Sequence, residues 1–179
     1  MHTIQDPTAD TGPTRRVVLC GSMKNHDLMS RIARFLHTAG LATVVPKPDA
    51  PAPGWTTDRL NLMKREAALH HMHHICRDDT AAVLVINVDR ANVPHYIGPN
   101  SFAEIGVAFS ASRQVFLLQR MPSAYEDELR AWGVTCLDRD VRPLLHALSA
   151  TSDVDMSGWT YALHGDPELS RECAMAADT

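Results

Sequence analysis

The residues that most invite a chemical interpretation lie at positions 96–106, where the sequence reads YIGPNSFAEIG. A loop rich in Gly, Pro and Asn leads into the pattern of a helix start, and Glu104 follows one turn later. Backbone N–H groups at a helix N-terminus attract anions, so we expect the same field to keep Glu104 ionised. An ionised carboxylate can attack the anomeric carbon of a sugar. The spacing Ser101-x-x-Glu104 equally suits a capping box, which stabilises a helix start and needs no further function.

A second polar segment follows an apolar run, where residues 20–24 read CGSMK. Gly21 lets the backbone approach a ligand, Ser22 offers a hydroxyl, and Lys24 carries a positive charge. This combination suits a phosphate or a ribose, although a Gly-Ser pair after a strand is also a common plain turn. The sequence lacks both the Walker P-loop spacing and the G-x-G-x-x-G pattern. Asn87 ends a later apolar run, where it could bind a sugar hydroxyl or simply form a turn.

Four histidines lie close together, at positions 70, 71, 73 and 74. On a helix, His70 and His74 share a face, and such a pair can bind zinc. The sequence lacks the H-E-x-x-H pattern and offers no evident third ligand, so we predict no metal site and no cofactor. We expect one histidine to face a ligand crevice and the others to face solvent. Lys64 precedes His71 by two helical turns, so these two share a face.

The composition limits the kinds of protein that this chain can be. It has 179 residues, 45% of them hydrophobic, which favours one domain with a sizeable core. Its formal net charge of -4 argues against nucleic-acid binding. The four cysteines form no C-x-x-C pair, so we expect reduced thiols and a cytoplasmic location. The sequence shows no apolar run that could cross a bilayer and no signal-peptide pattern, so no membrane partner is predicted.

Apolar runs alternate with segments of helical periodicity along the chain. Strands are predicted at 17–20, 41–45, 81–87, 115–118 and 134–137, and helices at 27–38, 57–77, 101–112, from about 123, and at 141–149. This alternation predicts an α/β fold with a parallel sheet covered on both faces. We expect a disordered lead-in at 1–15, one domain at 16–150 and an irregular tail at 151–179. Ligands of such sheets bind beyond the carboxyl ends of the strands, where the strand order reverses.

Three segments together resemble the nucleoside 2-deoxyribosyltransferase superfamily, which includes 2'-deoxynucleoside 5'-phosphate N-hydrolases. They are VLCGSMK at 18–24, Asp79 with the strand AVLVIN at 82–87, and FAEIGVA at 102–108. The similarity spans about residues 16–148. It implies a Rossmann-like parallel sheet of about five strands with helices on both faces. It also implies a homo-oligomer in which neighbouring subunits complete the pocket.

The resemblance also implies roles for individual residues. It makes Glu104 the nucleophile at the anomeric carbon. It assigns contacts with the sugar or its 5'-phosphate to the turn and loop residues Gly21, Ser22, Lys24, Gly98, Asn100 and Ser101.

Two positions depart from the pattern of the better-known members. Those proteins carry an Asp about eight residues before the residue that matches Asp79, where this chain has His71. They also carry a Tyr on the first strand near Val18, for which Tyr96 could substitute. The chain resembles more a bacterial branch in which we expect a Y-I-G-x-N motif and a His at this helix position. With an ordinary pKa of about 6.5, His71 is expected to protonate the leaving base.

The predicted function is cleavage of the N-glycosidic bond of a nucleoside or nucleoside 5'-monophosphate, by hydrolysis or by deoxyribosyl transfer. The alternative is a nucleotide or nucleotide-sugar sensor without turnover, which the absent Tyr and the replaced Asp favour. A third hypothesis is a metal protein built on the histidines. The expected partners are a small nucleoside or nucleotide and further copies of the same chain.

Overall fold

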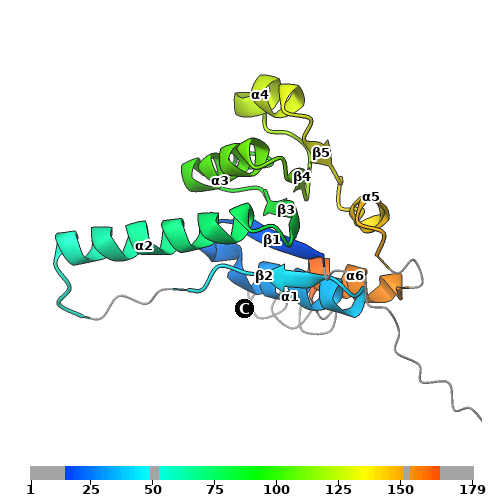
Figure 1. Cartoon of the computed structure of the whole chain (residues 1–179), viewed down its shortest axis with the longest axis horizontal. Coiled ribbons are helices and arrows are strands. Elements are labelled where there is room, and N and C mark those ends of the chain that lie inside the picture. The colour runs from blue at the N-terminus through cyan, green and yellow to red at the C-terminus, as the bar shows by residue number, and fades with distance from the viewer. Residues whose placement is uncertain (1–14, 49–52, 151–153, 166–179) are drawn as a thin grey trace, which may run out of the picture.

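A five-stranded parallel sheet forms the centre of the computed structural model, which describes residues 15–48, 53–150 and 154–165 (Figure 1). The strands run in the order β2-β1-β3-β4-β5, and every neighbouring pair is parallel. Their bounds are β1 (Arg16–Gly21), β2 (Ala42–Val44), β3 (Thr80–Ile86), β4 (Gln114–Leu117) and β5 (Thr135–Cys136). The predicted α/β fold with about five parallel strands is therefore confirmed, and each predicted strand lies within about a residue of its expected place.

Helices connect the strands and cover the sheet. They are α1 (His26–Thr38), α2 (Thr57–Cys76), α3 (Pro99–Ser110), α4 (Glu126–Ala131), α5 (Arg142–Ala147) and α6 (Met156–His164), with short 3-10 turns η1 (Met23–Asn25) and η2 (Ser123–Tyr125). The sequence predicts α1 to α5 with small errors at their ends. In the described part of the chain, no helix has the length and apolar composition that a membrane crossing needs.

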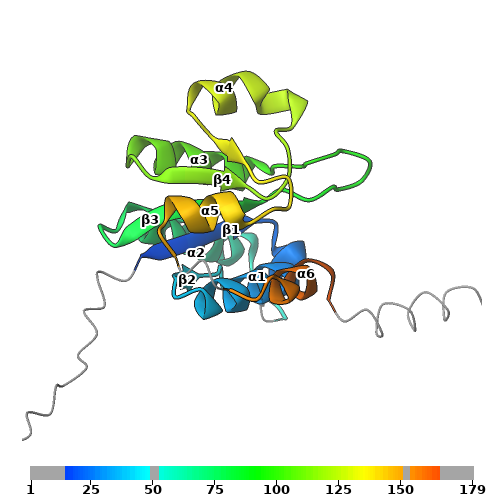
Figure 2. The ribbon, with the colours of Figure 1, turned by 90° about the vertical axis from the view of Figure 1, so that its right-hand side faces the viewer.

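Side chains of β1 alternate between the two faces of the sheet. Val17 and Leu19 belong to the core beneath α1, α5 and α6, whereas Val18 and Cys20 belong to the core beneath α2, α3 and α4. In Figure 1, α2, α3 and α4 lie on one side of the strands, and Figure 2 looks from the opposite side, with α5 in front of the sheet. These four side chains are fully buried because β1 is a central strand with both faces covered. Each such apolar side chain stabilises the fold by about 1.5–3 kcal/mol, so the position of β1 is strongly determined.

The predicted irregular tail is wrong for α6, which packs beside α1 (Figures 1 and 2). Asp155 caps this helix by accepting a hydrogen bond from the Ser157 N–H at 2.9 Å. The Trp159 ring packs on Phe35 with 5.2 Å between centroids, and its Nε1 donates to the Arg139 carbonyl at 2.7 Å. The nine residues of α6 are too few for a clear helical period, and burial against α1 stabilises them instead.

Other predictions about the ends of the chain lie largely outside the described residues. These are the disordered lead-in at 1–15, of which residues 1–14 lie outside, and the last part of the tail, 166–179. Among the described residues, Cys20, Cys76 and Cys136 form no disulfide, and Cys173 lies outside them.

The order of strands creates a crevice beside the end of β1. In the sheet, β2 is the neighbour of β1 on one edge of that strand, and β3 is its neighbour on the other edge. The carboxyl ends of β1 and β3 therefore meet where the strand order reverses, with Gly21 paired to Ile86. A Cβ atom at Gly21 would lie 3.2 Å from the carbonyl oxygen of Ile86, so a glycine suits this close approach.

We expect Trp159→Ala to lower the free energy of unfolding by about 3 kcal/mol, since it removes a large side chain that is only 4% exposed. Tyr161→Ala, at a position of the same helix that is 50% exposed, should change it by less than about 0.5 kcal/mol. Urea unfolding followed by circular dichroism measures both. Equal effects of the two substitutions would contradict the docking of α6.

Candidate active site

Three side chains from three different elements meet at the crevice: Cys20 of β1, His71 of α2 and Glu104 of α3. The Cys20 Sγ lies 3.4 Å from the His71 Nε2, within hydrogen-bonding distance for a sulfur. The same Nε2 lies 4.0 Å from a carboxylate oxygen of Glu104. Cys20 is fully buried, and the side chains of His71 and Glu104 are 8% and 13% exposed. We call these three residues the buried triad.

The elements that present the buried triad are held by apolar contacts on the same face of the sheet. Cys20 points to this face because of the alternation along β1. On α2, His71 and Ile75 lie four residues apart and are the two buried positions. On α3, Ile105 and Ala108 anchor the helix in the same core, and Glu104 lies beside this buried stripe. The packing of α2 and α3 therefore sets the distance between His71 and Glu104.

The buried triad borders an open cavity of about 310 Å³, to which His71 and Glu104 contribute. Three methionines lie along its wall, and two lysines, both exposed, bring positive charge to it. The lining residues are Gly21, Met23, Pro46, Lys47, Met63, Lys64, Ala67, Ala68, His71, Met72, Asn100, Ser101, Ala103 and Glu104. Volume and composition suit a small ligand with an apolar part and an anionic part.

Burial raises the pKa of Glu104 from 4.5 to about 7, and a hydrogen bond with Cys20 acts in the opposite direction. The expectation of a carboxylate kept ionised by the helix is therefore wrong near neutral pH. Helix α3 begins at Pro99 with Gly98 as its N-cap, so Glu104 lies in the second turn, where the field of the helix end is weak. Since Ser101 lies inside α3 and no side-chain cap bond is made at this helix start among the described residues, the predicted capping box is not formed.

Burial lowers the pKa of His71 from 6.5 to about 4, and a backbone hydrogen bond with Leu19 opposes this shift. The imidazole is therefore neutral near pH 7. The structure thus contradicts the expected role of His71 as a charged proton donor to a leaving base. Burial, together with the nearby Glu104, also raises the pKa of the Cys20 thiol well above its usual range, so this group is protonated.

Part of the predicted substrate-binding set lines the cavity. Gly21, Asn100 and Ser101 do so, and Lys64 lines it on the same face of α2 as His71, as the helical spacing predicts. Ser22 instead caps η1, where its Oγ accepts a hydrogen bond from the Lys24 N–H at 3.4 Å.

Besides Ser22, four further predicted residues in the described part of the chain are not among those that line the cavity: Lys24, Asn87, Tyr96 and Gly98. Lys24 is exposed. The predicted sugar contact of Asn87 is not supported, because its buried amide is used by the backbone beside the end of β4. It donates to the Arg120 carbonyl at 2.7 Å and accepts from the Gln119 N–H at 2.8 Å.

Tyr96 and Gly98 shape the loop that leads into α3. The Tyr96 ring lies 5.0 Å from the Arg90 guanidinium carbon, an arrangement typical of a cation–π contact. The same ring lies 3.5 Å from the place where a Cβ of Gly98 would stand. Tyr96 thus packs against Gly98, the N-cap of α3, and the structure gives no support to Tyr96 as a substitute for a first-strand tyrosine.

Sequence reasoning missed Lys47 and the methionines Met23, Met63 and Met72, which line the cavity. Lys47 stands in a proline-rich stretch that the sequence marks only as a loop. The sequence feature that could have indicated a site role for Lys47 is its position shortly after β2, because β2 and β1 are parallel and end at the same edge of the sheet. Methionines at these spacings have no motif, since they are common in helices and cores.

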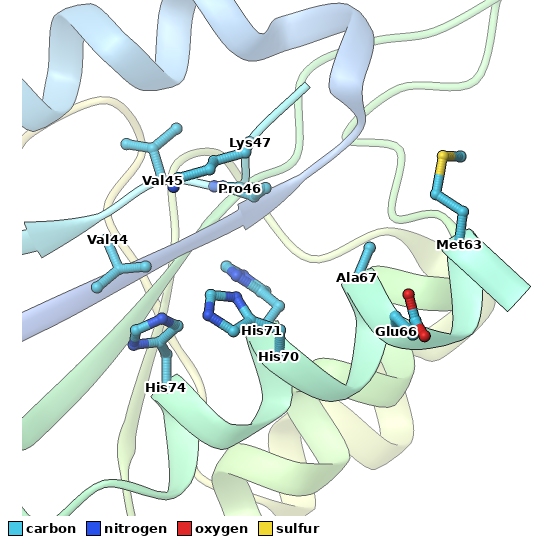
Figure 3. Close-up of a pocket in the computed structure, with 10 residues that line it drawn as sticks. All are labelled: Val44, Val45, Pro46, Lys47, Met63, Glu66, Ala67, His70, His71 and His74. Carbon is cyan, nitrogen blue, oxygen red and sulfur yellow. The ribbon is translucent and has the colours of Figure 1, made fainter. Parts of the chain in front are cut away.

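A neighbouring cavity of about 340 Å³ shares five lining residues with the first one: Pro46, Lys47, Met63, Ala67 and His71 (Figure 3). His70, His71 and His74 point from α2 toward Val44 at the end of β2 and toward Pro46 in the segment that follows it. The rings of His70 and His74 meet edge to face with 4.7 Å between centroids. His71 is the buried histidine of this group, as expected, but His70 and His74 also line the cavity, so the expectation that all the other histidines face only solvent is not met.

No protein-family model matches this chain, and a search of the curated proteins finds no match either. The resemblance to the nucleoside 2-deoxyribosyltransferase superfamily therefore stays a prediction.

The two pKa shifts make opposite contributions to the pH dependence of stability. The raised pKa of Glu104 contributes stability that is present below pH 4.5 and lost as the pH rises through about 7. The lowered pKa of His71 contributes stability that is present above pH 6.5 and lost as the pH falls through about 4. Between pH 4.5 and 6.5 the folded pair carries one proton, on Glu104, and the unfolded pair also carries one, on His71, so the two contributions cancel.

We therefore expect the free energy of unfolding to depend on pH in variants that lack one of the two groups, whereas the two dependences cancel in the unmodified chain. His71→Asn should make the free energy of unfolding fall as the pH rises from 4.5 to 7, and Glu104→Gln should make it rise between pH 4 and 6.5. Each slope is at most about 1.4 kcal/mol per pH unit. Urea unfolding at a series of pH values measures them. Slopes of the same sign in both variants would show that these groups do not titrate as described.

Proposed function

We propose that this protein cleaves the N-glycosidic bond of a nucleoside or nucleoside 5'-monophosphate. The observation that carries the proposal is the position of Glu104, whose carboxyl lines a cavity of about 310 Å³ beside a neutral imidazole. A carboxylate at a cavity wall, shielded from bulk water, suits covalent attack on a sugar carbon. The resemblance of residues 102–108 to the nucleophile segment of the 2-deoxyribosyltransferases supports the same role.

In the first step, an oxygen of the ionised Glu104 carboxylate forms a bond to C1' while the bond from C1' to the base nitrogen breaks. The electron pair of the broken bond leaves with the base. Since His71 is neutral near pH 7, the base takes its proton from water in the open cavity. The Cys20 hydrogen bond to Glu104 favours the ionised carboxyl and so supports the attacking form.

In the second step, water attacks C1' of the sugar ester and the Glu104 carboxylate leaves. The proton released by the water can pass to His71, whose Nε2 lies 4.0 Å from Glu104 and is free of charge. A second base in place of water would instead give deoxyribosyl transfer. The arrangement of the buried triad serves both outcomes.

The remaining walls of the cavity suit the other parts of a nucleotide. Methionine side chains adapt to flat apolar surfaces, so Met23, Met63 and Met72 can pack against a base. Lys47 and Lys64 supply two positive charges near the opening, which suits a 5'-phosphate. This distribution supports a nucleoside 5'-monophosphate over an uncharged nucleoside.

We expect Glu104→Gln to abolish release of free base from a panel of nucleosides and monophosphates while binding stays within about threefold, since the amide has the same shape but cannot attack. Chromatography of the products and calorimetric titration measure the two properties. Glu128→Gln, at an exposed position of α4, serves as the matched control and should keep full turnover. Unchanged base release by Glu104→Gln would end the proposal.

Because Lys64 lines the cavity, its position supports phosphate binding by this residue, whereas the sequence pattern favours Lys24. Lys64→Met should weaken binding of a nucleoside 5'-monophosphate by about fivefold, or ~1 kcal/mol for an exposed charge, and leave the nucleoside unaffected. Lys24→Met should change neither affinity. Calorimetric titration of both variants with both ligands decides between them, and a larger effect at Lys24 would contradict the assignment to Lys64.

A sensor without turnover is the second candidate, and the charge state of the site favours it. Because burial raises the pKa of Glu104 to about 7, a protonated form that cannot attack a sugar carbon is present near neutral pH, and neutral His71 is a poor proton donor to a leaving base. The unmodified chain distinguishes the two functions. Saturable nucleotide binding without any free base supports the sensor, and base release that depends on Glu104 supports the enzyme.

Self-association belongs to the same proposal. Leu62 and Leu69 of α2 are about half exposed, and the start of α2 extends beyond the other elements in Figure 1. Exposed apolar side chains on a helix are typical of interfaces between protein chains. They support the homo-oligomer that the family resemblance implies.

A further inference from the structure

We infer that the buried triad forms a binding site for a divalent transition-metal ion such as Zn²⁺. Cys20, His71 and Glu104 each offer one donor atom, and these sulfur, nitrogen and oxygen atoms all lie within 4.8 Å of one another. Thiolate, imidazole and carboxylate are the three side-chain ligand types that zinc uses in proteins. This inference stands on the donor geometry and does not require the proposed N-glycosidic activity.

The spacing of the donor atoms is close to that of a tetrahedral site. Typical zinc bond lengths separate neighbouring ligand atoms by about 3.3–3.6 Å in a tetrahedron. The Cys20 Sγ and His71 Nε2 are 3.4 Å apart, and the Nε2 is 4.0 Å from the Glu104 oxygen. The first distance already fits, and the second needs a shift of the Glu104 carboxyl of less than about 1 Å. Such a shift is open to a side chain that borders a cavity.

The surroundings of the buried triad are also those of a metal site. Its ligands come from β1, α2 and α3, which a common apolar core holds in place. A backbone hydrogen bond with Leu19 orients the imidazole, as partners of metal-bound histidines commonly do. His71 and Glu104 line the open cavity, so a water or a ligand atom can complete the tetrahedron from that side. Three protein ligands with one open position are typical of catalytic rather than structural zinc.

The histidines of α2 alone do not offer an equivalent site. Among the described residues, one group of at least three His, Cys, Asp or Glu side chains is close enough to share an ion. It consists of Cys20, His71 and Glu104. His70 and His74 lie edge to face on the helix. The sequence could not indicate the buried triad, because its members are separated by 51 and 33 positions along the chain.

Metal binding would exclude the proposed N-glycosidic reaction. Coordination requires the Cys20 thiol to lose its proton to solvent and uses a carboxylate oxygen of Glu104. The ion then draws off the negative charge that makes the Glu104 carboxylate a nucleophile, so that neither of its oxygens attacks C1' effectively. If the proposed function is correct, the ion is an inhibitor, and Zn²⁺ should suppress base release as it saturates the site.

The experiment is a titration of the untagged chain, stripped with a chelator, with Zn²⁺ in competition with a chromophoric chelator. We expect one tight site per chain. Cys20→Ser and His71→Asn should each weaken it by at least about 100-fold, since the loss of a mere supporting partner already costs about 10–100-fold. Cys136→Ser and His70→Asn serve as matched controls and should keep the affinity.

A second measurement on the unmodified chain guards against variants that fail to fold. Co²⁺ in place of Zn²⁺ should give a sulfur-to-cobalt charge-transfer band and the intense visible bands of tetrahedral cobalt. The absence of these bands would overturn the inference, as would equal zinc affinity in Cys20→Ser and Cys136→Ser. Because no nucleoside is present, these results do not depend on whether Glu104 is a nucleophile.

Discussion

The burial of three titratable side chains at the end of β1 is the constraint on which the candidate site depends. A charged group inside a protein is costly unless a partner of opposite charge or a metal ion compensates it. Burial therefore favours a protonated Cys20 thiol, a neutral His71 and a Glu104 carboxyl that ionises only near pH 7. In the resting site the thiol and the imidazole are therefore uncharged near neutral pH, and Glu104 is the group of the buried triad that titrates in this range.

The central position of β1 places these groups where a ligand can reach them. Its alternation directs Val17 and Leu19 to one core, and Val18 and Cys20 to the other. The strand then ends at Gly21, beside the point where the strand order reverses. Helix α2 contributes the buried His71 and Ile75 to this face, so the imidazole is held by one turn of a long helix whose other end is exposed.

The sheet could be predicted from the sequence because its strands are continuous apolar runs, which are typical of strands buried on both faces. The site could be predicted only in part. Glu104 and His71 were found through a motif and a spacing, but their protonation depends on burial, which a sequence does not show. The Ser101 capping box failed because Gly98 and Pro99 start α3 earlier. Asn87 has the polarity of a ligand contact, yet its amide bonds the backbone beside β4.

The two proposed roles of Glu104 require ligands of opposite charge in the cavity, an anionic nucleotide or a metal cation. Nucleophilic attack and metal binding both need the carboxyl to lose its proton, but only one partner can then occupy the oxygen. Lys47 and Lys64 are exposed near the opening, whereas the donor atoms of Cys20, His71 and Glu104 are buried. An anionic nucleotide satisfies the lysines and brings its sugar to the carboxylate. A small cation is repelled by the two lysines, and only the bonds to the buried donor atoms favour its binding. Charge at the opening therefore favours nucleotide entry, and the donor set inside favours the metal, so their relative concentrations decide which one occupies Glu104.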